Sequence, residues 1–211
     1  MRKKAEILEI MKIFAAEYPN PQSELNFHNP YTLLVAVVLS AQSTDKGVNK
    51  ATEKLFEIAD TPQKMLDLGL ENLKQYIKTI GLFNNKAKNI IELSRQLVEN
   101  FNGCVPADRD ALVGLAGVGR KTANVVMNVW YNQPTLAVDT HVMRIAHRLD
   151  FSKGKTPLEV ENDLMKVLPA EMVVHTNHWL VLFGRYICKA QKPLCEKCPI
   201  SGYCTSKDKR L

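Results

Sequence analysis

The 211-residue sequence lacks several features that would point to common protein classes. No run of apolar residues reaches the roughly 18 positions that a membrane-spanning helix needs, which argues against a membrane protein. No stretch alternates apolar and polar residues convincingly at period two, so a sheet-based fold is disfavoured. Internal repeats, low-complexity tracts and flexible linkers are missing too, which excludes a repeat array and leaves no obvious domain boundary.

The composition is that of an ordinary globular protein with a basic bias. Hydrophobic residues make up 45% and charged residues 24% of the chain, enough to bury one core or two small ones. Lysine and arginine number 28 against 22 acidic residues, giving a formal charge of +6. This excess suits a polyanionic partner such as a nucleic acid without establishing one.

The N-terminal segment predicts a retained helix and no export signal. Acidic residues at Glu6 and Glu9 interrupt the stretch that follows the basic start, and Ile7, Ile10 and Phe14 recur at helical spacing. We therefore expect the protein in the cytoplasm, associated with the nucleoid if the source is bacterial. In that reducing compartment, its five cysteines favour metal ligation or free thiols over disulfides.

Helix signals recur along the whole chain and predict an all-α fold. Longer helices are expected up to about 18 and over 31–41, 45–58, 84–98, 121–129 and 171–186, with shorter ones opening near 62, 109, 140 and 157. The apolar segment 32–39 also fits a buried parallel strand. Asn29 as a cap, Pro30 at the first helical position and the helical surroundings favour a helix.

A glycine turn with a following lysine is the first candidate site. Gly117 and Gly119 allow a sharp turn and a close approach of the backbone, and a helix start follows them. Such a start offers N–H groups and a positive dipole end to a phosphate. Lys121, in the first turn, is interpreted as a nucleophilic amine. The alternatives are an ordinary inter-helix turn and a solvated lysine.

Asp139 is the second candidate, and it has two readings. It precedes a helical segment beginning at Thr140, so it predicts a helix N-cap. It can equally act as a catalytic carboxylate that accepts a proton and stabilises positive charge.

Four cysteines near the end of the chain form the most specific pattern. Cys188, Cys195, Cys198 and Cys204 are spaced C-x6-C-x2-C-x5-C, which lets their thiolates surround a single site. A zinc ion is the alternative occupant of this site, but four-cysteine zinc sites usually come as two C-x2-C pairs. One close pair with two wide spacings favours an iron–sulfur cluster.

Taken together, these motifs resemble the endonuclease III family, the iron–sulfur helix-hairpin-helix DNA glycosylases with apurinic/apyrimidinic lyase activity. The resemblance covers essentially the whole chain. It includes residues 24–27, 39–45, 80–82, 117–124 and 138–141 and the four cysteines. One departure is Ala116, which stands where the family commonly has proline.

The resemblance implies a two-lobed fold and assigns the site residues. One lobe is a six-helix domain spanning 22–133 and containing the helix-hairpin-helix. The other combines 1–21 with 134–211 and carries a 4Fe-4S cluster held by the four cysteines. The target base would flip into the cleft between the lobes, with Lys121 and Asp139 as catalytic residues. The DNA-binding residues implied or expected are Gln42, Leu82, Gly117, Gly119, Arg120, Lys192 and Lys197.

The expected activity is base excision repair of damaged double-stranded DNA by a monomer. Lys121 would form a Schiff base with the sugar, release an oxidised or ring-saturated pyrimidine and cleave the strand 3′ to the lesion by β-elimination. Gln42 and Leu82 would fill the gap left in the duplex. The loop lysines Lys192 and Lys197 would contact phosphates.

Two other functions are weighed against this one. An adenine glycosylase shares the fold and the cluster, but that branch carries a carboxylate on its early apolar helix and lacks the lysine. Here residues 32–39 contain no acid and Lys121 is present. A non-catalytic hairpin module needs phosphate contacts only, and it explains neither Lys121 with Asp139 nor the cysteines.

Overall fold

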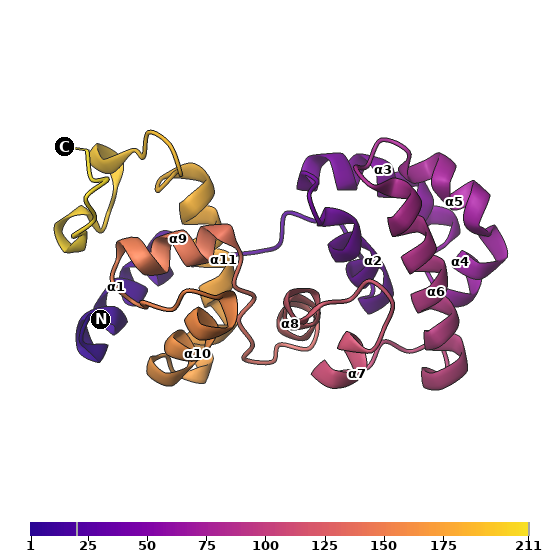
Figure 1. Cartoon of the computed structure of the whole chain (residues 1–211), viewed down its shortest axis with the longest axis horizontal. Coiled ribbons are helices and arrows are strands. Elements are labelled where there is room, and N and C mark those ends of the chain that lie inside the picture. The colour runs from indigo at the N-terminus through magenta and orange to yellow at the C-terminus, as the bar shows by residue number, and fades with distance from the viewer. Residues whose placement is uncertain (20, 211) are drawn as a thin grey trace. The chain divides into compact units, whose positions relative to one another are not determined.

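The computed structural model describes residues 1–19 and 21–210, and within them it contains helices but no strand (Figure 1). The α-helices are α1 Lys4–Glu17, α2 Pro30–Ser40, α3 Asp45–Ile58, α4 Pro62–Leu68, α5 Leu70–Ile77, α6 Phe83–Phe101, α7 Arg109–Val113, α8 Arg120–Val129, α9 Thr140–Arg148, α10 Pro157–Val167 and α11 Ala170–Tyr186. Two short 3-10 helices follow, η1 Cys195–Lys197 and η2 Ser201–Tyr203. The all-α fold is confirmed.

The chain divides into two compact units, each with its own hydrophobic core. The first unit combines Met1–Gln22 with Pro134–Leu211, and the second is the continuous segment Ser23–Gln133. The hairpin turn and Lys121 therefore belong to the second unit, whereas Asp139 and the four cysteines belong to the first.

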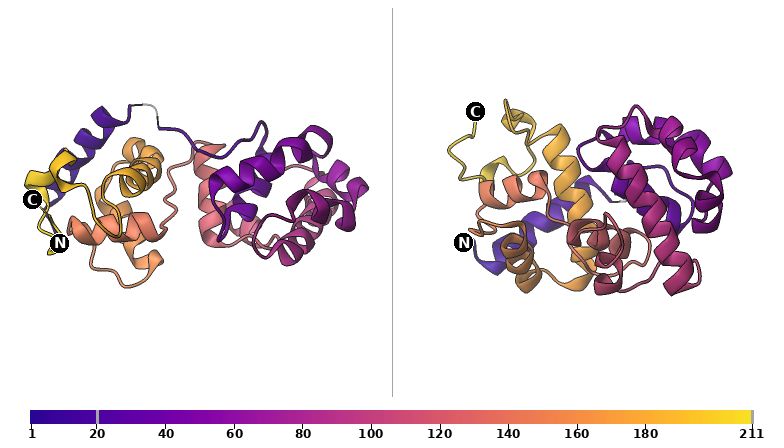
Figure 2. Two further views of the ribbon diagram at one scale, coloured as in Figure 1. Left: turned by 90° about the horizontal axis from the view of Figure 1, so that it is seen from above. Right: turned by 45° about the vertical axis from the view of Figure 1, so that its right-hand side comes forward.

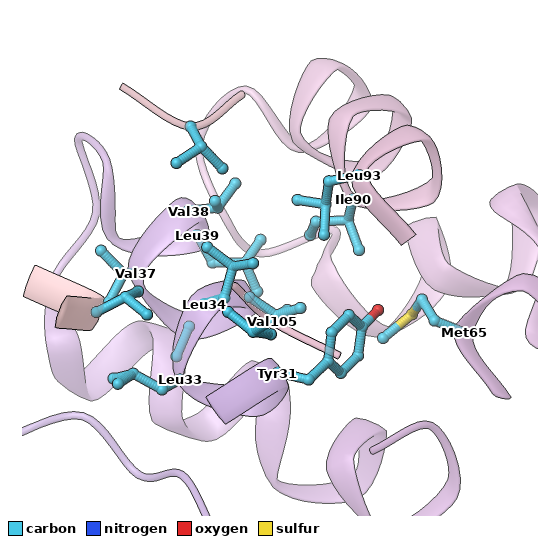
Figure 3. Close-up of a cluster of buried hydrophobic side chains, with 14 of the residues drawn as sticks. Tyr31, Leu33, Leu34, Val37, Val38, Leu39, Met65, Ile90, Leu93 and Val105 are labelled. Carbon is cyan, nitrogen blue, oxygen red and sulfur yellow. The ribbon is translucent and has the colours of Figure 1, made fainter. Parts of the chain in front are cut away.

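Helix α2 is the centre of the second unit. It packs against α3, α6 and α8, and every residue from Tyr31 to Leu39 is buried. Figure 3 shows side chains of α2 meeting Met65 of α4 and Ile90 and Leu93 of α6. Because the helix is enclosed on several sides, its sequence is apolar all round, and the alternative reading of this run as a strand is wrong. Its start is fixed by a capping box between Asn29 and Thr32.

The first turn of α6 differs from the sequence-based expectation. The sequence predicts that Asn84 or Asn85 opens this helix, but the helix begins at Phe83. The residue in the cap position is Leu82, which has a left-handed backbone (φ 59°, ψ 27°). Its side chain makes no capping hydrogen bond. The chain enters α6 through a tight left-handed residue, which no local capping signal indicates.

The core of the first unit forms where α1 and α9 pack on α11. Phe14 of α1 and Phe183 of α11 meet edge to face with ring centroids 4.9 Å apart. Gly184 allows α9 to approach, because a Cβ there would stand 3.0 Å from side-chain atoms of His141 and Arg144. Figure 2 shows the helices of this unit from two further directions. The start of α9 therefore packs closely against α11.

No helix in the described part of the chain is long and apolar enough to span a membrane.

Candidate functional site

The glycine turn joins α7 to α8 and is anchored on both sides by buried residues. Asp108 caps α7, its Oδ1 accepting a hydrogen bond from the N–H of Ala111 at 2.9 Å. Leu115 and Val118 turn inward into the core. The N–H of Val118 donates to the carbonyl of Leu115 at 3.1 Å and closes the turn.

Gly117 is required by both conformation and space. Its φ of 75° is in the left-handed region, and a Cβ would lie 2.7 Å from Nδ2 and 2.8 Å from Cβ of Asn89 on α6. The neighbouring Ala116 N–H donates to Oε1 of Gln96, also on α6, at 2.8 Å. Helix α6 therefore supports the turn from below, and a side chain at position 117 would push the two apart.

Lys121 stands in the first turn of α8 with its side chain exposed. Gly119 occupies the cap position and has no side chain to cover the helix end. The rest of α8 is held by Ala123, Val126 and Met127 in the core. An amine on a rigid helix start, beside a turn suited to phosphate, is well placed to meet a sugar–phosphate backbone.

Asp139 caps α9 with a single oxygen. Its Oδ1 accepts hydrogen bonds from the N–H groups of both His141 and Val142, each at 2.8 Å. In the described part of the chain, Oδ2 accepts no hydrogen bond. One carboxylate oxygen thus receives both hydrogen bonds of the helix cap. Nearby, burial is the largest cause of a lowered pKa at His141, and Arg144 and Arg185 add to it while Asp139 opposes it.

Gln42 lies at the tip of a tight turn between α2 and α3. The N–H of Ser43 donates to the carbonyl of Ser40 at 3.0 Å, and Ala41 has φ −56° and ψ 116°. Gln42 follows with φ 56°, which gives the pattern of a type II turn. That position favours glycine or asparagine, so the exposed glutamine is held in a strained backbone.

Leu82 is strained in the same way and lies close to this turn. It has φ 59° and is 60% exposed, an uncommon combination for a large apolar residue. A Cβ atom added to the adjacent Gly81 would lie 3.8 Å from the carbonyl oxygen of Gln42. The structure therefore brings together two residues that lie forty positions apart in the sequence, both exposed and both left-handed.

Lys86 was not anticipated from the sequence, although it lies at this same place. Only 6% of the residue is exposed, and its Nζ donates to the carbonyls of Leu39 (2.9 Å) and Ala41 (2.6 Å) and to Oγ of Ser43 (3.1 Å). Burial lowers the pKa of this ammonium group. A lysine in the first turn of a helix is ordinarily exposed to solvent. Only the folded structure shows that Lys86 donates hydrogen bonds to the end of α2 and the turn after it.

The four cysteines line one hollow in the first unit, together with Arg148, Leu149, Phe183, Ile187, Pro193, Leu194, Ile200, Ser201 and Lys209. Burial raises the pKa of the Cys198 thiol, and the other three cysteines are close enough to raise it further. Four thiolates around one hollow are a donor set that fits an iron–sulfur cluster, in which each thiolate has its own iron.

The cysteine loop is fastened to α9 by two arginines. Arg148 donates to the carbonyls of Lys189 (2.7 Å) and Ala190 (3.2 Å) and to Sγ of Cys188 (3.3 Å). Arg144 donates through Nε to the carbonyl of Cys188 at 3.2 Å. Both arginines lie on the helix that Asp139 caps, so the loop and the carboxylate share one support.

The lysines predicted to contact DNA lie on the outside of this loop. Lys192 and Lys197 are both exposed, and Lys192 has a left-handed backbone with φ 49°.

Comparison with known proteins identifies the class. Residues 35–170 match the family model of the HhH-GPD superfamily of base excision DNA repair proteins. Residues 188–204, which begin and end on cysteines, match the iron–sulfur binding domain of endonuclease III. The fold and the cysteine loop therefore define a helix-hairpin-helix DNA repair glycosylase with an iron–sulfur cluster.

The relatives narrow the class to one family. Endonuclease III of Haemophilus influenzae is 55% identical over 98% of both chains, and that of Escherichia coli K12 is 54% identical over the same shares. A trapped covalent intermediate of endonuclease III with DNA superposes with a TM-score of 0.92 at 48% identity, covering 97% of each chain. A thermostable thymine-DNA glycosylase gives 0.82 at 25% identity, covering 96% of this chain and 95% of that one.

The chain belongs to the endonuclease III family. It is a DNA glycosylase and apurinic/apyrimidinic lyase of base excision repair, and its cofactor is a 4Fe-4S cluster. The family and the cofactor expected from the sequence are confirmed.

Proposed function

We propose that this enzyme removes oxidised or ring-saturated pyrimidines from duplex DNA and then cleaves the strand 3′ to the lesion, with Lys121 as the nucleophile. The observation that carries the proposal is the exposed amine in the first turn of α8, directly after a turn that only glycine can make at position 117. A phosphate bound at that turn brings the neighbouring sugar to the amine.

The first step exchanges one bond at the sugar for another. The neutral Nζ of Lys121 attacks C1′, the bond from C1′ to the base breaks, and the electron pair leaves with the base. The nitrogen then loses one proton to Asp139, its lone pair forms the second C–N bond as the C1′–O4′ bond breaks, and O4′ takes up a proton. The product is a protonated imine joining Lys121 to C1′.

The second step uses that imine to break the strand. The protonated imine makes the C2′ proton acidic, so a base removes it and the electrons move to expel the phosphate from C3′. This β-elimination leaves a 5′-phosphate on one fragment and an unsaturated sugar on the other, and water then releases Lys121.

Asp139 supplies the carboxylate for this chemistry. It takes a proton from the attacking amine and stabilises the positive charge that grows on the sugar as the base leaves. The free Oδ2 supports this role, because Oδ1 alone holds the end of α9.

DNA is the partner, bound by a single copy of the chain within the nucleoid. Gly117, Gly119 and Arg120 hold phosphates at the hairpin, and the net charge of +6 favours a polyanion. The DNA complexes of endonuclease III among the similar structures support this partner. Gln42 and Leu82 fill the gap when the damaged base leaves the stack.

Cys188, Cys195, Cys198 and Cys204 would hold the 4Fe-4S cluster, and their ligation would order the loop between them. The ordered loop then presents Lys192 and Lys197 to DNA phosphates.

The substrate class is argued from what α2 contains. Expelling a normal adenine benefits from an acid that protonates the base, and the buried run from Thr32 to Leu39 has no ionisable side chain. Saturated pyrimidines have lost aromatic stacking, so they leave the duplex at lower cost. They also suit an enzyme that relies on one amine and one carboxylate.

Borohydride trapping tests the nucleophile. Reduction should cross-link the wild-type protein to duplex DNA containing an abasic site, and Lys121→Gln should abolish the adduct while DNA binding persists. Lys46→Gln is the matched control, because Lys46 is also an exposed lysine at the second position of a helix, α3. Trapping that survives Lys121→Gln places the nucleophile elsewhere.

A panel of duplexes with single lesions tests the substrate. Thymine glycol and dihydrouracil should be released with strand cleavage, and adenine opposite 8-oxoguanine should stay in place. Preferential release of that adenine without cleavage would contradict the proposed substrate class.

A further inference from the structure

The segments that carry Gln42 and Leu82 are joined by one buried lysine. Lys86 follows Leu82 by one helical turn, and its backbone N–H donates to the carbonyl of Leu82 at 3.1 Å. Its ammonium group reaches across to Ala41 and Ser43, the two neighbours of Gln42. The same residue therefore contacts both strained loops, one through its main chain and the other through its side chain.

The ammonium group has its full set of partners. A lysine has three N–H donors, and the carbonyls of Leu39 and Ala41 and the hydroxyl of Ser43 accept one each. The two carbonyls belong to the C-terminal end of α2, where the helix dipole is negative and a cation is favoured. Two main-chain carbonyls and one hydroxyl therefore hold the ammonium group in place.

The hydrogen bonds of Lys86 hold two loops whose backbone conformations are energetically unfavourable. Gln42 has φ 56° and Leu82 has φ 59°, and both backbones persist only if their surroundings hold them there. A rigid pair of exposed side chains at fixed spacing is what filling a gap in duplex DNA requires.

We propose that Lys86 is a positioning residue that fixes Gln42 and Leu82 for insertion into damaged DNA. This inference rests on the proposed gap-filling role of those two residues. Lys86 touches neither the base nor the sugar, and it acts only through the two loops that it joins.

Lys86→Met tests the idea, because it keeps most of the unbranched side chain and removes the three donors. Thymine glycol excision should fall about 10- to 100-fold under single-turnover conditions, the size expected from a displacement of about 1 Å. Hydrogen exchange should rise in segments 41–43 and 82–86 and stay unchanged elsewhere in the second unit. Unchanged exchange there overturns the proposal whatever the activity.

A matched control separates positioning from stability. Tyr31→Phe also removes a buried hydrogen bond between α2 and α6, the 2.6 Å contact of Tyr31 with Ser94, but at a distance from the two loops along α2. It should lower the melting temperature and leave excision within about twofold. If Tyr31→Phe and Lys86→Met reduce excision alike, Lys86 contributes only stability. Should Lys86→Met fail to fold, Ser43→Ala removes one acceptor and should give the same pattern at smaller size.

A mutant cycle completes the test. In a Gln42→Ala/Leu82→Ala background there is nothing left to position, so adding Lys86→Met should cost less than a further twofold. Losses that multiply overturn the inference and leave the proposed function intact. Wild-type protein that fails to excise thymine glycol, or a double variant that excises normally, instead contradicts the proposed function.

A duplex with 2-aminopurine opposite a tetrahydrofuran abasic analogue gives a readout without chemistry, and Lys86→Met should reproduce the fluorescence of the double variant.

Discussion

Replacing Asp139 with asparagine separates the two roles that the structure gives to this carboxylate. Both N–H donors of the α9 cap use Oδ1, at 2.8 Å each, and an asparagine keeps that oxygen in place. The substitution converts Oδ2 to an amide nitrogen, which can neither accept a proton nor carry negative charge. Asp139→Asn therefore removes the proposed chemistry and leaves the cap.

The expected effects on stability are small and can be ordered. Asparagine and aspartate cap helices about equally well, so Asp139→Asn loses only the attraction of the charge to the dipole, about 0.3–1 kcal/mol. For a chain of this size that amounts to at most about 2–4 °C in melting temperature. Asp139→Ala loses the cap as well, and it should cost about 0.5–2 kcal/mol.

Activity should follow a different order from stability. Loss of a general acid–base group typically reduces the rate by about 10²- to 10⁴-fold, so both variants should excise poorly despite their different melting temperatures. Single-turnover excision of thymine glycol and thermal melting are the two measurements. Asp108→Asn is the control, because Asp108 also caps a helix but lies at the end of α7 away from the glycine turn. If Asp139→Asn melts normally and excises at the wild-type rate, Asp139 is a cap and nothing more.

Three further outcomes are expected. Leu82→Gly should be more stable than Leu82→Ala by about 0.5–1 kcal/mol, since only glycine relieves the left-handed strain, and both should excise poorly; an alanine variant that is the more stable contradicts the strain. Lys192→Ala and Lys197→Ala should each weaken binding of all duplexes alike and reduce the salt slope by about 1, and unchanged slopes would remove them from the interface. Because the pKa of His141 is lowered in the fold, its contribution to stability is complete above about pH 6.5 and lost as pH falls, and acid melts of His141→Gln should lack that loss.

Helix starts with a polar cap could be predicted from the sequence because their signals are local. Asn29 caps α2, Asp108 caps α7, and Thr156 forms a capping box with Glu159 at α10, each as the residue pattern indicates. The glycine turn could be predicted for the same reason, since the conformation at Gly117 excludes other residues.

Interactions between distant segments could not be predicted in this way. The sequence shows Arg144 and Arg148 four positions apart on one helix, but not that both donate to the cysteine loop around Cys188. Lys86 reads as a solvated lysine until α2 places its last carbonyls beside it. These partners are brought together only by packing within each unit, and the hydrophobic periodicity of the sequence does not predict them.

The start of α6 could not be predicted from the sequence, because local preference and the observed backbone conflict there. Capping preference selects Asn84 or Asn85, and left-handed backbone preference selects glycine, yet Leu82 holds the position with most of its side chain exposed. A sequence shaped by stability alone would place asparagine or glycine at this point and again at Gln42. Gln42 and Leu82 are thus both unfavourable residue types for a left-handed backbone, and they lie on two neighbouring loops. The two exceptions support the proposed gap-filling role, which calls for a large apolar and a long polar side chain at these two positions.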